Sequence, residues 1–155
     1  MKILVVTISD RAFRGEYEDL SGPAVKEILE KKVSGADVDV IVVPDEEEDI
    51  LRALESGLGF AAVITTGGTG LGPRDITPEV TERFCDREVP GISEMLRAES
   101  LGETRNAALS RGYSGMKGRT LVVNIPGSLR GASFCARLLA PLLEHAGGMI
   151  SGDGH

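Results

Sequence analysis

The sequence predicts a single α/β domain with three layers, α/β/α, built around a mostly parallel sheet. Four short apolar runs rich in β-branched residues are typical of buried strands, namely residues 3–8, 38–43, 61–65 and 120–125. Helix-like stretches separate these runs, and strands that alternate with helices favour a parallel sheet with helices on both faces. A length of 155 residues is typical of one such domain.

Helices are expected in the stretches that separate the strands. Residues 23–33 and 50–58 are helix-like, and residues 78–109 have room for two or three more helices. Ser21 lies two residues before the first of these stretches, ahead of Gly22-Pro23, and serine is a favoured N-cap residue. We therefore expect Ser21 to cap the first helix.

The last helix is expected at residues 130–145, where apolar side chains recur at helical spacing. Pro141 within this stretch should kink or split the helix, because proline lacks the N–H group that an interior helical residue donates. We expect the domain to span residues 1–148 and the glycine-rich residues 149–155 to form a flexible tail.

The composition argues against several classes of partner. The formal net charge is −7 and the pI is near 4.9, whereas binding to nucleic acid or to an anionic membrane requires a basic face. Cys85 and Cys135 belong to no CxxC pair or metal-ligand cluster, so reduced thiols and a cytoplasmic location are expected. Residues 1–8 are too short for a signal peptide or membrane helix and are expected to form the first strand.

A glycine-rich loop follows the third predicted strand. It contains Thr66-Gly67-Gly68-Thr69-Gly70 and continues through Arg74 and Asp75 to a helix start at Thr77-Pro78. Glycine allows positive φ and leaves backbone N–H groups unobstructed, so the loop is expected to bind an anion such as a phosphate. No P-loop is present, and the GxGxxA string at residues 57–62 precedes a strand, so it predicts a helix-to-strand turn rather than a dinucleotide site.

Polar residues follow all four predicted strands. These are Ser9-Asp10-Arg11, Pro44-Asp45, the glycine-rich loop and residues 124–128. The carboxyl ends of parallel strands share one edge of the sheet, where open α/β folds bind ligands. We therefore expect one cleft at this edge, with Arg11 and Arg74 as the best-placed arginines for a phosphate.

Asp45 and Asp75 each have two interpretations. Both lie beside the predicted anion site, where a Mg²⁺ ion that carries phosphate oxygens takes one or two carboxylates. Asp45 also resembles a helix N-cap, since Glu48 follows three residues later, and Asp75 also resembles a turn residue. The residues alone leave these alternatives open. Ser110 and Ser128 have no histidine partner for nucleophilic catalysis, so capping or a hydrogen bond to the ligand is expected of them.

Several strings of residues together point to a known family. They are Ile8-Ser9-Asp10-Arg11, Glu18 to Pro23, Val43 to Glu46, Thr65 to Glu79, Pro90-Gly91, Leu109-Ser110-Arg111 and Asn124 to Ser128. In this order, and over nearly the whole chain, they resemble the molybdopterin-binding proteins of molybdenum cofactor biosynthesis, which include bacterial molybdopterin adenylyltransferases and the G domain of gephyrin. The resemblance implies the molybdopterin-binding fold, a compact α/β structure that is usually trimeric.

The resemblance also implies which residues bind the substrates. The terminal phosphate of molybdopterin is expected at Thr66, Gly67, Gly68, Thr69, Gly70, Arg74 and Ser110. The nucleotide is expected at Ser9, Asp10, Arg11, Pro126, Gly127 and Ser128. Asp45 and Asp75 match the acidic positions associated with metal-dependent adenylyl transfer, so they are the implied catalytic and Mg²⁺-binding residues.

The first functional hypothesis is a molybdopterin adenylyltransferase that uses Mg²⁺, transfers AMP from ATP to the terminal phosphate of molybdopterin and releases pyrophosphate. A catalytically silent molybdopterin-binding carrier or scaffold is the main alternative, and a nucleotide-utilising enzyme with another acceptor is a third. The resemblance further implies a homotrimer and hand-over of the product to the molybdenum-inserting enzyme. The sequence assigns no role to Glu94 and no substrate contacts to residues 97–117.

Overall fold

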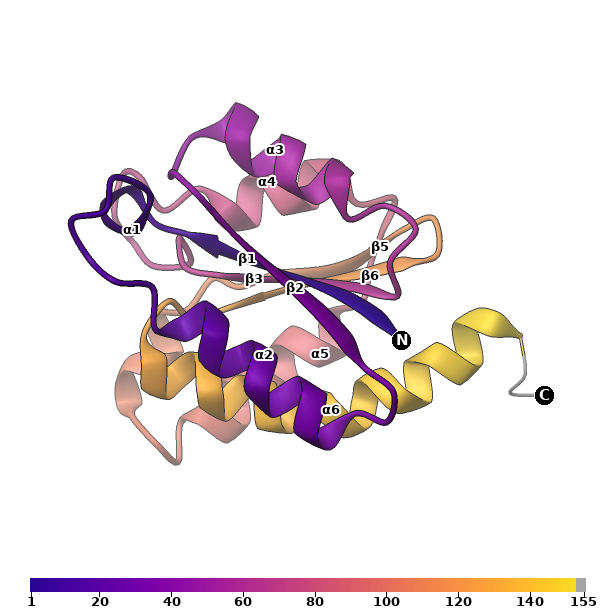
Figure 1. Ribbon diagram of the computed structural model, residues 1–155. Helices are drawn as coiled ribbons and strands as arrows, with labels where there is room; N and C mark the ends of the chain where they lie inside the picture. Colours follow the sequence, from indigo (N-terminus) through magenta and orange to yellow (C-terminus); the bar gives the residue numbers. More distant parts are fainter. Residues whose placement is uncertain (153–155) are drawn as a thin grey trace.

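The computed structural model describes residues 1–152, which form one six-stranded sheet in the order β2-β1-β3-β6-β5-β4 (Figure 1). The strands are β1 (Lys2–Ile8), β2 (Asp37–Val43), β3 (Ala62–Thr66), β4 (Arg87–Glu88), β5 (Ser114–Lys117) and β6 (Thr120–Ile125). The pairs β1–β2, β1–β3 and β3–β6 are parallel, whereas β5 pairs antiparallel with β6 and β4 with β5. The prediction of a mostly parallel sheet in a single domain is confirmed.

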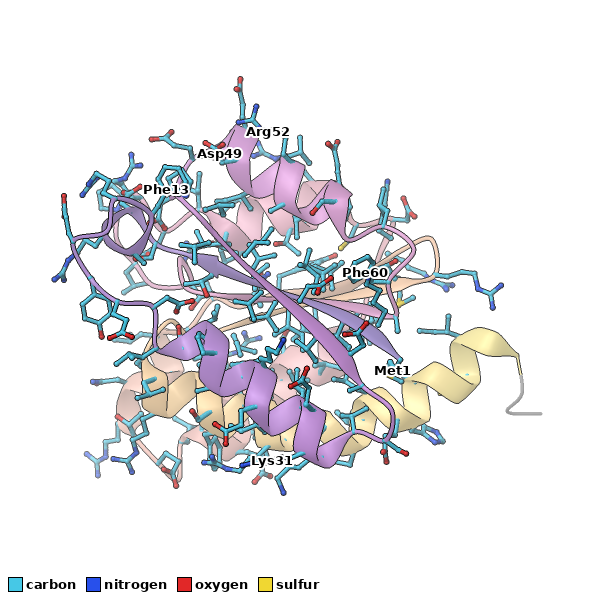
Figure 2. All side chains as sticks on the ribbon, viewed as in Figure 1. Met1, Phe13, Lys31, Asp49, Arg52 and Phe60 are labelled. Atoms are coloured by element: carbon cyan, nitrogen blue, oxygen red, sulfur yellow. The ribbon has the colours of Figure 1, made fainter. Side chains whose placement is uncertain are left out.

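The helices cover both faces of this sheet. They are α1 (Asp10–Phe13), α2 (Ser21–Lys32), α3 (Glu47–Ser56), α4 (Thr77–Phe84), α5 (Pro90–Ser100), the 3-10 helix η1 (Arg105–Leu109) and α6 (Leu129–Ser151). Figure 1 shows α3 and α4 on one face and α2, α5 and α6 on the other. Charged side chains such as Lys31 of α2 and the Asp49–Arg52 pair of α3 point away from the sheet (Figure 2). The three predicted layers are therefore present.

The alternation of side chains along the strands divides the core in two. Ile3 and Val5 of β1 belong to the cluster under α2, α5 and α6, whereas Leu4 and Val6 belong to the cluster under α3 and α4. All four side chains are buried. A central strand with apolar residues on both faces is what a sheet between two helical layers requires.

Two strands were not predicted. β4 has two residues, and β5 has the sequence Ser-Gly-Met-Lys, which combines glycine and lysine with little β-branched content. β5 pairs antiparallel with β6 across the short turn at Gly118-Arg119, and β4 pairs with β5, which is distant from it in sequence. No local hydrophobic pattern marks them.

The predicted cap of the first helix was wrong. Ser21 is the first residue of α2, and the N-cap residue Leu20 makes no side-chain hydrogen bond. The Asp19 carboxylate takes this role, because its Oδ1 accepts from the backbone N–H of Gly22 at 3.0 Å and from the Ser21 hydroxyl at 3.2 Å. A carboxylate two residues upstream reaches the free N–H groups better than the serine does.

Helix α6 is longer than predicted and is not split at Pro141. It continues to Ser151, six residues beyond the predicted end at residue 145. Leu139 and Leu143 lie on either side of Pro141 and are both buried in the core, so tertiary packing holds the helix together across the missing hydrogen bond. Residues 149–151 of the predicted tail are helical, residues 153–155 lie outside the described part of the chain, and the flexibility of the tail stays a prediction. In residues 1–152, no helix has the length and apolar character needed to span a bilayer.

Both cysteines are free thiols with raised pKa values. Burial raises the pKa of Cys85 to about 11 and also raises the pKa of the buried Cys135. At pH 8 a thiol with that pKa is about one part in a thousand thiolate, whereas an unperturbed cysteine is about one quarter thiolate. We therefore expect iodoacetamide to alkylate Cys85 of the native protein on the order of 100-fold more slowly than a free cysteine, and to alkylate Cys135 more slowly than a free cysteine as well. Equal rates in the native protein and in concentrated guanidinium chloride would contradict this, with mass spectrometry as the measurement.

Candidate functional site

The site is built where the carboxyl ends of β1, β3 and β6 meet. The loop after β3 is joined to the loop after β6, because the Thr66 hydroxyl donates to the Pro126 carbonyl at 2.7 Å and the Gly67 N–H donates to the Ile125 carbonyl at 3.2 Å. Gly127 packs against the α-carbon of Gly67, to which a Cβ at position 127 would approach within 3.0 Å. We call residues 66–70 and 126–128 together the ridge.

Two hollows of different chemistry lie along the ridge and share no lining residue. The acidic cleft, of about 580 Å³, is lined by Asp19, Asp45 and Asp75, by Ser9, and by the ridge residues Thr66, Gly67, Gly68 and Gly127. The apolar pocket, of about 1000 Å³, is lined by Ala107, Leu109, Ser110 and Phe134, and by the ridge residues Thr69, Gly70, Pro126 and Ser128. The structure thus brings most of the predicted site residues to one edge of the sheet and distributes them over two hollows.

The ridge requires glycine at two adjacent positions. Gly67 has φ of 108° and Gly68 has φ of 66°, values that L-residues with a side chain rarely adopt. A Cβ at position 67 would overlap the carbonyl oxygen of Ile8, and a Cβ at position 68 would overlap the Thr77 hydroxyl. Strand β1 and helix α4 therefore pack directly against the backbone of the two glycines.

Asp45 is not the cap of α3. The N-cap residue of α3 is Glu46, which makes no side-chain bond, whereas Asp45 Oδ2 accepts from the Asp10 N–H at 2.8 Å. Asp10 Oδ1 in turn accepts from the Asp45 N–H at 3.0 Å. Burial raises the pKa of Asp45, and the nearby carboxylates of Asp10 and Asp75 act in the same direction. The capping interpretation was wrong, and a half-buried carboxylate of raised pKa faces the acidic cleft.

Asp75 serves the local turn and also lines the acidic cleft. Its Oδ2 accepts from the Gly72 N–H at 2.8 Å, so the turn interpretation agrees with the structure. The same side chain lines the cleft with Asp45, and its charge contributes to the raised pKa of Asp45. Carboxylate oxygens are ligands that a divalent cation such as Mg²⁺ takes, so the two side chains together favour a cation in this part of the cleft.

The arginines predicted for a phosphate lie outside both hollows. Arg74 forms a double contact with Asp10, from Nε to Oδ2 at 2.6 Å and from Nη2 to Oδ1 at 3.1 Å, and also pairs with Glu46 at 2.7 Å. This contact holds the pKa of Asp10 below its usual range. Arg11 lies over the Tyr17 ring, 5.3 Å from its centre. Asp10 and Arg74 each contact Asp45, and Arg11 contacts Tyr17, so all three adjoin residues that line the acidic cleft.

Arg111 is a residue whose contribution the sequence did not reveal. Its backbone N–H donates to the Thr69 carbonyl at 2.9 Å, its Nε donates to the Gly70 carbonyl at 2.8 Å, and its Nη2 donates to the Asp75 carbonyl at 2.5 Å. Its Nη1 pairs with the Glu79 carboxylate. One residue therefore braces the glycine-rich loop at three carbonyl oxygens, and the available signal was its place in Leu109-Ser110-Arg111, one of the strings shared with the family.

Asp19 is the second residue that the sequence did not assign to the site. It lines the acidic cleft, and its Oδ2 accepts from the Thr7 hydroxyl at 2.8 Å. The available signal was its place within Glu18 to Pro23, one of the strings shared with the family. Its carboxylate is satisfied by three donors, in contrast to that of Asp45.

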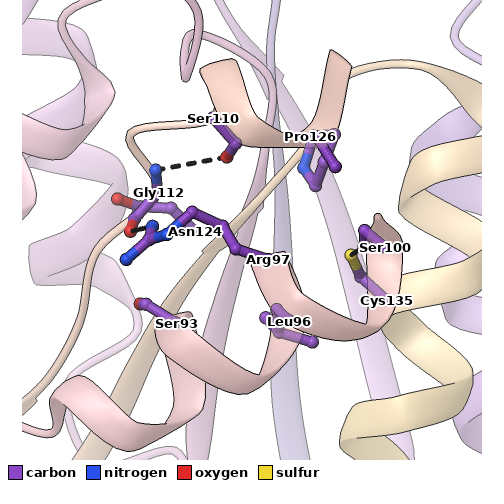
Figure 3. Close-up of a pocket in the computed structure, with 10 residues that line it drawn as sticks. Ser93, Leu96, Arg97, Ser100, Ser110, Gly112, Asn124, Pro126 and Cys135 are labelled. Atoms are coloured by element: carbon purple, nitrogen blue, oxygen red, sulfur yellow. Dashed lines mark hydrogen bonds between the residues drawn. The ribbon is translucent and has the colours of Figure 1, made fainter. Parts of the chain in front are cut away.

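A smaller recess of about 310 Å³ adjoins the apolar pocket (Figure 3). Four residues line both spaces, namely Ser100, Ala107, Ser110 and Pro126. The recess extends between α5 and β6, where Arg97 and Asn124 lie. We call it the Arg97 recess.

Comparison with known proteins identifies the family. A family model described as a probable molybdopterin binding domain matches residues 4–145. The molybdopterin adenylyltransferase of Helicobacter pylori is 37% identical over 153 residues, which cover 96% of this chain and 87% of that protein. The molybdenum cofactor synthesis protein cinnamon of Drosophila melanogaster is also 37% identical, over 96% of this chain, but the chain spans only 25% of that longer protein.

Solved structures agree with the sequence comparison. A molybdopterin biosynthesis protein from Mycobacterium abscessus superimposes with a TM-score of 0.92 at 38% identity, covering 99% of this chain and 98% of that one. The molybdopterin biosynthesis enzyme MoaB from Thermus thermophilus gives a TM-score of 0.87 at 41% identity, covering 97% and 96%. The resemblance and the predicted fold are thereby confirmed, and the chain belongs to the molybdopterin-binding domain family of molybdenum cofactor biosynthesis.

Proposed function

We propose that this protein is a Mg²⁺-dependent molybdopterin adenylyltransferase, which transfers AMP from ATP to the terminal phosphate of molybdopterin and releases pyrophosphate. The observation that carries the proposal is the pair of dissimilar hollows that lie along one glycine-rich ridge of backbone. Two substrates that react through their phosphates need separate pockets for their bodies and a shared place for the phosphates. Membership of the family and the similarity to the Helicobacter pylori enzyme support the same assignment.

In this proposal each hollow receives the substrate whose chemistry it matches. The acidic cleft takes the metal-bound triphosphate, because carboxylates are the ligands Mg²⁺ takes alongside phosphate oxygens. The apolar pocket takes the flat pterin, and the ridge residues from Thr66 to Gly70 and from Pro126 to Ser128 contact the reacting phosphates from both sides. Ser9 and Ser110 lie at the walls of the cleft and of the pocket, respectively. Asp10, Arg11 and Arg74 contribute through their contacts with the lining residues Asp45 and Tyr17.

The donor set fits a magnesium ion that arrives with its phosphates. In the part of the chain that the structure describes, no three His, Cys, Asp or Glu side chains are grouped as a metal site. Asp45 Oδ1 accepts no hydrogen bond from residues 1–152, and Asp75 lies beside it in the cleft. Asp45 and Asp75 would hold Mg²⁺, which neutralises charge on the phosphate oxygens when bound. Phosphate oxygens and water would complete its coordination.

The protein's own task in this reaction is alignment. A phosphate oxygen of the pterin forms a bond to the α-phosphorus of ATP while the bond from that phosphorus to the bridging oxygen breaks, and pyrophosphate leaves. The backbone N–H groups of Gly68, Thr69 and Gly70 orient the two phosphates, since the Gly67 N–H already donates to Ile125, and the brace from Arg111 keeps this part of the ridge in place. The residues that line the two hollows include no activated nucleophile, and the displacement needs none.

The proposal is tested by giving the purified protein molybdopterin, ATP and Mg²⁺ and measuring pyrophosphate. Release of pyrophosphate that depends on all three is expected, with the Helicobacter pylori enzyme as the positive control. Binding of molybdopterin without any turnover would reject adenylyl transfer and favour a carrier or scaffold. Release with other acceptors but not with molybdopterin would favour a different nucleotide-utilising enzyme.

A homotrimeric assembly, a cytoplasmic location and hand-over of the product to a molybdenum-inserting enzyme belong to the same proposal. Sedimentation of the purified protein tests the first of these, since a trimer has three times the 16.4 kDa mass of the chain.

A further inference from the structure

Arg97 is a cationic side chain without an anionic partner. It lies on α5, and its Nη1 donates to the Gly112 carbonyl at 2.8 Å (Figure 3). No carboxylate in residues 1–152 lies within ion-pair distance of it, whereas Arg74, Arg83 and Arg111 are all paired. A guanidinium has five N–H donors, so four of them have no partner in the described protein.

The position of Arg97 on its helix does not account for this arrangement. A cation in the last turn of α5 interacts favourably with the helix dipole, but that interaction is available to an arginine pointing into solvent. Arg97 is instead half-buried and lines the recess with the hydroxyl groups of Ser100 and Ser110. A guanidinium turned into a recess with free donors indicates a ligand that accepts hydrogen bonds.

The recess meets the apolar pocket along one wall. Ser100, Ala107, Ser110 and Pro126 line both spaces, so the recess joins the apolar pocket at these four residues, and the Arg97 guanidinium lies beyond them beside Gly112 (Figure 3). The Ser110 Oγ accepts from the Gly112 N–H at 3.3 Å, which leaves its hydroxyl hydrogen available to donate. This edge of the pocket therefore offers donors, and it selects a heterocycle whose facing edge carries an acceptor.

We propose that Arg97 is a specificity-determining residue that donates a hydrogen bond to the carbonyl oxygen of the pyrimidinone ring of the pterin. This inference rests on the proposed function in one respect, namely that the pterin occupies the apolar pocket. A pterin carries one ring carbonyl, while a 2,4-diaminopteridine carries an amino group at that position. Arg97 therefore favours the pterin, whose carbonyl oxygen accepts a hydrogen bond, over the 2,4-diaminopteridine, because an amino group and a guanidinium are both donors.

The direct test compares molybdopterin binding by Arg97→Met, Arg97→Lys and the wild-type protein, measured by pterin fluorescence without ATP. We expect Arg97→Met to raise the Kd for molybdopterin about 10- to 100-fold, the range for a hydrogen bond to a charged group. Arg97→Lys should recover part of this loss. Arg105→Met is the matched control, because Arg105 is exposed on η1 and its side chain makes no hydrogen bond or ion pair in residues 1–152. An unchanged Kd in Arg97→Met would overturn the proposal.

A second readout separates recognition from a structural role through Gly112. The Kd for ATP and the melting temperature of Arg97→Met should stay close to the wild-type values. A parallel rise in the Kd for molybdopterin and the Kd for ATP would show that Arg97 acts through the loop that contains Gly112 instead. In competition experiments at pH 8, 6-hydroxymethylpterin should displace molybdopterin from the wild-type protein at lower concentration than its 2,4-diamino analogue does. In Arg97→Met the two compounds should displace molybdopterin equally well. Equal competition, or none by either compound, overturns the carbonyl contact. If the wild type binds molybdopterin but releases no pyrophosphate, adenylyl transfer fails while this inference stands.

Discussion

Asp45→Asn is expected to lower kcat for adenylyl transfer on the order of 10²- to 10³-fold, the range seen when one group that stabilises transition-state charge is lost. The substitution removes the charge and keeps the shape. Asparagine retains an oxygen that accepts the hydrogen bond from the Asp10 N–H, so the reciprocal contact between the two loops survives. Molybdopterin binding should persist, because Asp45 lines the acidic cleft and not the apolar pocket.

The measurement is pyrophosphate release over a range of Mg²⁺ concentrations, together with molybdopterin binding. Asp75→Asn should behave similarly, since its amide oxygen still accepts from the Gly72 N–H. Asp49→Asn is the matched control, an acid-to-amide change on α3 where the carboxylate pairs with Arg52 away from the cleft. Loss of molybdopterin binding in proportion to kcat would assign the aspartate a structural role, and a normal rate would reject the metal role.

Gly67→Ala is expected to have the largest effect on stability. The φ of 108° costs an alanine about 1–3 kcal/mol in backbone strain. The overlap of its Cβ with the Ile8 carbonyl oxygen adds about 1–3 kcal/mol more, because β1 is a central strand and cannot move away. Urea denaturation followed by circular dichroism measures the sum as a fall in the free energy of unfolding.

Gly59→Ala separates the two contributions. Gly59 has a similar φ of 88°, but a Cβ there meets nothing within 4 Å, so only the strain should appear. A similar loss of stability in both variants would mean that the ridge moves to accommodate the methyl group. In that case the close fit between Gly67 and β1 would not be a requirement of the fold.

The parts of the fold that were predicted are those whose cause is local. The apolar runs at β1, β2, β3 and β6 mark buried strands in any context, and their order with the helices determines a parallel sheet. β4 and β5 form because β6 offers an edge, and a sequence of Ser-Gly-Met-Lys does not show that. Pro141 illustrates the opposite case, in which a local signal to break the helix is overridden by buried leucines on both sides.

The candidate site shows the same difference between features with a local cause and features that depend on tertiary contacts. The glycine-rich loop and the two aspartates were found because several glycines and carboxylates at strand ends exceed what a turn needs. The role of Arg111 was not found, because its partners Gly70 and Asp75 lie 41 and 36 positions away in sequence. The hydrogen-bond partner of Asp45 was also predicted wrongly. Whether its carboxylate caps α3 or accepts from the Asp10 N–H depends on how the loops after β1 and β2 meet. Contacts of this kind are decided by tertiary structure.

The brace from Arg111 has a consequence for the kinetics of substrate binding. A free glycine-rich segment samples many backbone conformations, and a ligand that orders it loses affinity to the entropy of each residue it fixes. Here the carbonyls of Thr69, Gly70 and Asp75 are already tethered from the opposite side of the loop. A phosphate that binds at the ridge therefore loses little affinity to the conformational entropy of the loop. Its rate of binding is not limited by ordering of the loop.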